Sequence, residues 1–73
     1  MLKLPVISGD RCISALGRVG YKVAHIRGSH VRMRCPNRNP VTVPRHDELD
    51  RGTLRAILRT TEISVEEFIT LLK

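Results

Sequence analysis

The sequence has few aromatic residues: one tyrosine, one phenylalanine and no tryptophan among 73 residues. Folds that bind RNA by stacking bases on a sheet need exposed aromatic side chains, and we assign Tyr21 and Phe68 to the core. The chain also lacks a glycine-rich phosphate loop and a nucleotide fingerprint. These absences argue against a base-stacking RNA-binding sheet and against an enzyme with a nucleotide cofactor.

Cysteine and long apolar segments are scarce as well. Cys12 and Cys35 are too few and too far apart for a zinc motif or a disulfide framework, and we interpret both as small buried apolar residues. No apolar run has the length of a membrane-spanning helix, and the start, MLKLPVISGD, lacks the features of a secretory signal. We expect a single cytoplasmic domain over residues 1–73, with no cofactor and no metal, since no carboxylate cluster is present.

Acidic residues are absent between Asp10 and Asp47. The formal net charge is +6 and the isoelectric point is near 10.4. Ten of the thirteen basic residues are arginine, whose planar guanidinium group can donate two parallel hydrogen bonds to a phosphate. This distribution indicates a polyanionic partner, although a basic surface that only aids solubility is the alternative. The acid-free span carries these basic residues: Arg11, Arg18, Lys22, Arg27, Arg32, Arg34, Arg38 and Arg45.

The pattern of apolar residues predicts an α+β fold with helices on one face of a sheet. Ser8 is a good N-cap for a first helix, which Gly20 ends. Strands are predicted over 21–26, 29–35 and 41–44, with a turn over 36–40. A second helix is expected over about 53–59 and a short last helix after the capping box of Ser64 and Glu67. The order is helix, three antiparallel strands, helix, short helix, as in a double-stranded-RNA-binding domain.

The register of the first hairpin follows if its apolar residues share a buried face. Val23 would then face Val31 and Tyr21 would face Met33 across the strands, with a three-residue loop of Ile26, Arg27 and Gly28. In this register Ala24 is opposite His30, Lys22 is opposite Arg32, and His25 faces the helices. A two-residue loop of Arg27 and Gly28 would set Val23 against Arg32 and is rejected.

The strand over 29–35 alternates strictly, so that His30 lies on the face opposite Val31 and Met33. Histidine is the side chain best suited to move a proton near neutral pH, and cations near it could stabilise charge on a phosphodiester. From the residues alone, an ordinary surface histidine is the stronger alternative for His30. We interpret His25 and His46 as ordinary histidines. The expected RNA-binding residues are Lys22, Arg27, Arg32 and Arg34.

The sequence resembles the HicA toxin family, also called YcfA-like. The resemblance runs through LPVISGDRCISALGRVGY, RGSHVRM and VTVPRH to GTLRAILRTTEISVEEF, and so covers nearly the whole chain in order. It implies a fold like a double-stranded-RNA-binding domain, an endoribonuclease that cleaves messenger RNA without the ribosome, and a HicB-type antitoxin as partner. It also implies that His30 is catalytic, with Gly28 and Ser29 completing the motif.

Two departures from the family pattern are visible. The family often has arginine at the position of His25, and glycine within TTEIS, where this chain has Glu62. We expect neither departure to affect the proposed chemistry. The residues identify no general acid to work with His30. A non-catalytic RNA-binding module on the same basic face is the competing function; DNA binding has less support, because no helix carries an array of base-reading side chains.

Overall fold

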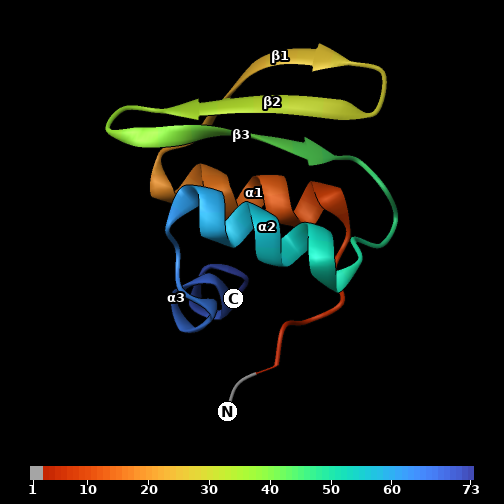
Figure 1. Cartoon of the computed structure of the whole chain (residues 1–73), viewed down its shortest axis with the longest axis vertical. Helices are drawn as coiled ribbons and strands as arrows, with labels where there is room; N and C mark the ends of the chain where they lie inside the picture. Colours follow the sequence, from red (N-terminus) through yellow and green to blue (C-terminus); the bar gives the residue numbers. More distant parts are fainter. Residues whose placement is uncertain (1–2) are drawn as a thin grey trace.

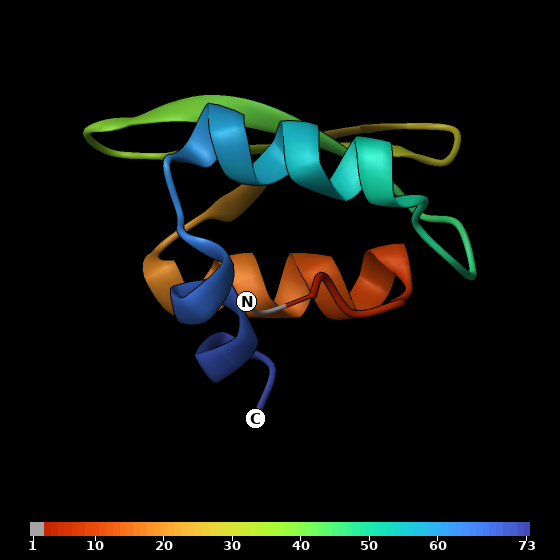
Figure 2. The same cartoon turned by 60° about the horizontal axis from the view of Figure 1, so that its bottom comes forward.

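The computed structural model describes residues 3–73. Its elements are α1 (Gly9–Val19), β1 (Lys22–Arg27), β2 (His30–Cys35), β3 (Arg38–Pro44), α2 (Arg51–Thr61) and α3 (Val65–Leu71). The strands form one antiparallel sheet in the order β1–β2–β3. Helices α1 and α2 lie on one side of this sheet and α3 lies beyond them (Figures 1 and 2). This is the predicted α+β arrangement of a double-stranded-RNA-binding domain.

The helix ends follow from local capping residues. The Ser8 side chain accepts a hydrogen bond from the Arg11 N–H, and Gly20 ends α1 with a left-handed φ of 118°, both as predicted. Helix α2 is longer than the predicted 53–59. Its N-cap is Asp50, whose carboxylate accepts the Thr53 N–H at 2.7 Å, so the helix starts two residues earlier. Hydrogen bonding to Thr53 holds the pKa of the Asp50 carboxyl group below its ordinary value.

Strand β3 is also longer than predicted, because the turn before it is shorter. Only Pro36 and Asn37 form the turn, where Asn37 takes a left-handed φ of 67°. The strand therefore begins at Arg38 instead of Val41. Pro40 is compatible with this strand because β3 lies at the edge of the sheet, where a missing N–H is tolerated.

The predicted register of the β1–β2 hairpin is wrong. The loop has two residues, Gly28 and Ser29, and Val23 faces Met33 while Ile26 faces Val31. The prediction assumed that β1 is buried on one face. Every residue of β1 is instead exposed, with Val23 49% and Ile26 52% exposed, since β1 is the strand farthest from the helices (Figure 1). Burial therefore does not set its register.

The turn and a β-bulge set the register of β1 instead. Gly28 has a φ of 60° and Ser29 does not have a positive φ, which is the φ pattern of a two-residue type II′ turn. The register shifts between Val23 and His25, so Ala24 is an extra residue without a partner on β2. As a consequence Ala24 is not opposite His30, and Lys22 faces Arg34 instead of Arg32.

One hydrophobic core lies between the sheet and the helices. Tyr21 and Phe68 belong to it, as predicted, and the Tyr21 hydroxyl donates to the Asn39 carbonyl at 2.8 Å. Cys12 is fully buried, and burial raises the pKa of its thiol to about 12. Cys35, predicted to be buried, is only partly so. Within residues 3–73, none of the helices is both long and apolar enough to span a membrane.

Candidate functional site

The side of the sheet away from the helices carries the polar residues of the strands. Because residues paired across antiparallel strands project to the same face, the pairs Lys22–Arg34, His25–Arg32, Arg27–His30 and Arg32–Thr42 define one surface. All of these side chains are exposed. We call this surface the outer face; its residues are Lys22, His25, Arg27, His30, Arg32, Arg34 and Thr42. Six of them, all except Lys22, line one shallow hollow.

His25 belongs to this hollow, and its predicted orientation toward the helices is wrong. In an unbroken strand His25 would project to the same side as Val23, because residues two apart share a face. The bulge at Ala24 shifts the alternation by one residue, so Val23 and Ile26 project to the helix side while His25 and Arg27 project outward. Bulges commonly redirect a side chain in this way. The sequence gives no direct signal for this bulge.

Two histidines and two arginines form a four-cornered group on the outer face. His25 is paired with Arg32, and Arg27 is paired with His30. The two histidines therefore occupy one diagonal of the group and the two arginines the other. Diagonal neighbours on antiparallel strands lie roughly 7–8 Å apart. An anion above the centre of the group can be contacted by both guanidinium groups while an imidazole lies on each side.

The structure separates the eight basic residues of the acid-free span into two sets. Arg11 and Arg18 donate to the carbonyls of Leu72 and Lys73 at the end of the chain. Arg38 donates to the Thr61 carbonyl at the C-terminus of α2, where the helix dipole makes a positive charge stabilising. Arg45 pairs with Asp10 at 2.9 Å. These four have structural partners, whereas the other four belong to the outer face: Lys22, Arg27, Arg32 and Arg34.

The outer-face cations have no carboxylate partner in the part of the chain that the structure describes. The Arg45–Asp10 pair is the one salt bridge formed among residues 3–73. On the outer face, the Arg32 guanidinium donates a hydrogen bond to the neutral Thr42 hydroxyl, at 3.2 Å. Like charges also face each other at Lys22 and Arg34. This concentration of uncompensated positive charge favours an anionic ligand.

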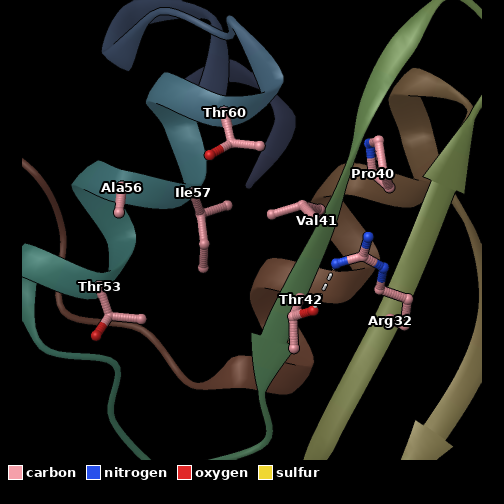
Figure 3. A pocket seen from close by; sticks show the side chains of 8 residues that line it. All are labelled: Arg32, Pro40, Val41, Thr42, Thr53, Ala56, Ile57 and Thr60. Carbon is pink, nitrogen blue, oxygen red and sulfur yellow. Dashed lines mark hydrogen bonds between the residues drawn. The ribbon is translucent and has the colours of Figure 1, made fainter.

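Arg32 extends from the outer face to a second hollow at the edge of the sheet. Figure 3 shows its guanidinium beside β3, where it donates to Thr42, with α2 on the other side of the hollow. Apart from Arg32, the lining is neutral: Pro40, Val41, Thr42, Thr53, Ala56, Ile57 and Thr60. This second hollow has no acid–base residue, so we place the candidate chemistry on the outer face. Arg32 and Thr42 line both hollows and connect them.

The remaining residues singled out from the sequence lie around the hairpin turn. Gly28 takes a left-handed φ of 60°, where a side chain is strained, although a Cβ there would meet no neighbour within 4 Å. The Ser29 carbonyl accepts the Arg45 N–H at 2.6 Å, which connects the turn to the end of β3. His46 is exposed in the link after β3 and does not line the hollow. Within residues 3–73 no three histidine, cysteine, aspartate or glutamate residues are grouped as metal ligands.

Sequence reasoning also missed an arginine row on α2. Arg51, Arg55 and Arg59 are exposed and spaced four residues apart, so they lie along one side of the helix. None of them lines the hollow of the outer face. The four-residue spacing is visible in the sequence and could have identified this row. It provides cations on a different surface, which is useful as a control for charge effects.

Comparison with known families gives a match over residues 9–63, to the family described as "HicA toxin of bacterial toxin-antitoxin". This range is more than half of the chain. The chain belongs to the HicA toxin family. A comparison with curated proteins finds no match. The HicA match includes α1, the whole sheet and α2, and with them every residue of the outer face.

HicA membership identifies the chain as a toxin of a toxin–antitoxin pair. The HicA match begins at the first residue of α1 and ends at Ile63, just before α3. The turn residues Gly28 and Ser29 and the strand residue His30 all lie inside it.

Proposed function

We propose that this HicA-family toxin is an endoribonuclease that cleaves messenger RNA on its outer face. The observation that carries the proposal is the position of His30: an exposed histidine within a hollow whose charged lining residues are cations without carboxylate partners. An uncovered basic sheet face fits a polyanionic backbone. An imidazole among those cations supplies the proton-accepting group that cleavage of RNA requires.

The reaction that suits these residues is attack of a ribose 2′-hydroxyl on the adjacent phosphorus. His30 takes the proton of the 2′-hydroxyl as the new P–O2′ bond forms. Arg27, directly opposite His30, and Arg32, two residues along β2, contact the non-bridging phosphate oxygens and stabilise the charge that grows on them. The P–O5′ bond then breaks, which leaves a 2′,3′-cyclic phosphate and a 5′-hydroxyl once O5′ has gained a proton.

The other outer-face cations bind the RNA backbone to one side of the cleaved bond. Arg34 and Lys22 face each other across β1 and β2 at the far end of the face from the turn. Gly28 and Ser29 form the turn that places Arg27 beside His30. Because none of these side chains is a base-stacking aromatic, recognition depends mainly on the backbone, and binding varies little with base sequence.

The proposal is tested with one oligonucleotide made in two forms. The purified protein is incubated with an RNA and with the same RNA carrying a single 2′-deoxy nucleotide at each mapped cleavage site. We expect cleavage of the RNA into fragments with 2′,3′-cyclic phosphate ends and no cleavage at the deoxy positions. A protein that binds the RNA but leaves it intact would instead support the non-catalytic RNA-binding module.

The partner expected from the family is a HicB-type antitoxin. The outer face is the natural surface for inhibition, because an acidic protein surface complements its charge and would exclude RNA from His30. We therefore propose that the antitoxin covers this face.

A further inference from the structure

His25 is the outer-face residue to which the proposed reaction gives no role. It is exposed, it lines the hollow together with His30, and a β-bulge directs it there. Cleavage by the proposed route needs a second group, because the departing O5′ must receive a proton. Apart from His25 and His30, the residues lining the hollow are arginines and a threonine, none of which exchanges protons readily near neutral pH.

We propose that His25 is the general acid of the reaction and His30 the general base. The inference rests on the proposed endoribonuclease function. The two imidazoles occupy opposite corners of the four-cornered group, with Arg27 and Arg32 at the other corners. In-line displacement places the attacking O2′ and the departing O5′ on opposite sides of phosphorus, and diagonal histidines match these two positions.

The spacing of the diagonal agrees with this assignment. The Cα atoms of diagonal neighbours lie roughly 7–8 Å apart. Two hydrogen bonds of about 2.8 Å each together with the width of a phosphate group span a similar distance. The backbone therefore separates the two histidines by about the span of one bound phosphate, and we assign one imidazole to each bridging oxygen and the arginines to the non-bridging oxygens.

Protons balance without a further reactant. Neutral His30 accepts the 2′-hydroxyl proton as the P–O2′ bond forms, and protonated His25 gives its proton to O5′ as the P–O5′ bond breaks. After the reaction His30 is protonated and His25 is neutral, and exchange with water restores both. No oxidant, metal ion or cofactor takes part in these steps.

A reaction that needs one neutral and one protonated imidazole has a bell-shaped dependence of kcat/KM on pH. The charged and titratable groups that face His25 are Lys22 and Arg27 on its own strand and His30, Arg32 and Arg34 on β2. Within residues 3–73, β1 is an edge strand of the sheet, with β2 as its neighbour. The cationic side chains keep their charge across the range in which histidine titrates. The acid limb of the pH profile therefore reports the general base, His30, and the alkaline limb reports the general acid, His25.

The experiment compares His25→Gln with the unmodified protein on two RNA substrates. One substrate is ordinary RNA; in the other, sulfur replaces the bridging O5′ at a single cleavage site. A thiolate leaves without being protonated, so the sulfur substrate does not need a general acid. We expect His25→Gln to lower kcat/KM on ordinary RNA by about 10²-fold or more and to remove the alkaline limb of the profile. On the sulfur substrate its rate should be close to that of the unmodified protein.

Matched variants separate proton donation from charge and from general effects of histidine loss. His25→Arg keeps a cation but has no transferable proton, so it should stay as slow as His25→Gln on ordinary RNA. His46→Gln removes the histidine outside the hollow and should leave both rates unchanged. His30→Gln should stay slow on both substrates, since its role lies in the attack and not in the departure.

Several results would overturn the assignment. His25→Gln or His25→Arg cleaving ordinary RNA at the unmodified rate would show that no proton from His25 is needed. An equal loss on the oxygen and sulfur substrates would show that His25 only binds or positions RNA. In both cases the proposed endoribonuclease function stands. If the unmodified protein cleaves neither substrate, both the function and the assignment are wrong.

Discussion

Replacing Arg34 with glutamine removes one positive charge from the outer face without disturbing the core. Its side chain is exposed and faces Lys22 across the strands, without a carboxylate partner. Arg55→Gln is the matched control, because it makes the same change of charge on the exposed side of α2. The two variants have equal net charge, so a difference between them reports where the RNA lies.

The expected magnitude follows from the number of phosphate contacts. Each phosphate neutralised on a single strand contributes about 0.7 to the slope of log K against log salt. Four outer-face cations (Lys22, Arg27, Arg32 and Arg34) lack carboxylate partners, so if each contacts one phosphate the slope is about 4 × 0.7, or about 2.8. Arg34→Gln should lower the slope by about 0.7, and Arg55→Gln should leave it unchanged.

The assay is fluorescence anisotropy with a 2′-O-methyl RNA, which binds but has no 2′-hydroxyl for attack, over a series of salt concentrations. An equal fall in slope for both variants would place the RNA over α2 as well as the outer face. A slope near zero for the unmodified protein would refute phosphate-led binding altogether.

Three further outcomes are expected. Gly9→Ala should strongly destabilise the fold in thermal melts, since its Cβ would overlap the Pro44 carbonyl oxygen. Gly17→Ala in the same helix meets no atom within 4 Å and should stabilise the fold by about 0.5–1 kcal/mol; the reverse order of the two variants would contradict this packing. Cys35 should react with a thiol reagent in the native protein, and Cys12 should react only on unfolding. Burial raises the pKa of Cys12 from 9.0 to about 12, so the free energy of unfolding should fall as pH rises across that interval. The fall should be smaller in Cys12→Ala. Hydrogen exchange should show β1 and β2 protected in the antitoxin complex; protection confined to the helices, with His30 still open, would refute masking of the outer face.

The sequence was sufficient for the elements whose signals are local or periodic. Ser8, Gly20 and Ser64 are caps by residue type, and all three act as caps in the structure. Strand β2 alternates strictly, which predicted both its buried face and the exposure of His30. The positions of Arg32 and Arg34 beside His30 follow from the same alternation. These predictions depend on one strand at a time and need no knowledge of its neighbours.

The prediction was wrong where it depended on how β1 packs. The prediction treated Val23 as buried, but β1 is the strand farthest from the helices and Val23 is exposed, so burial does not constrain the register. The bulge at Ala24 then exchanged the faces of the following residues and brought His25 into the hollow. The hydrogen bonds of Arg11, Arg18 and Arg38 to carbonyls distant in sequence were equally invisible, because charge alone does not distinguish a structural arginine from a free one.

The central claim is that His30 performs chemistry on RNA, and His30→Ala tests it most directly. Its exposed side chain leaves no cavity when truncated, so stability should change by about 0.5 kcal/mol or less. We expect the purified variant to keep its circular dichroism spectrum, its affinity for RNA and its complex with the antitoxin, while RNA cleavage falls by about 10²–10⁴-fold and its expression no longer arrests growth. Cleavage by folded His30→Ala at close to the unmodified rate would contradict the account.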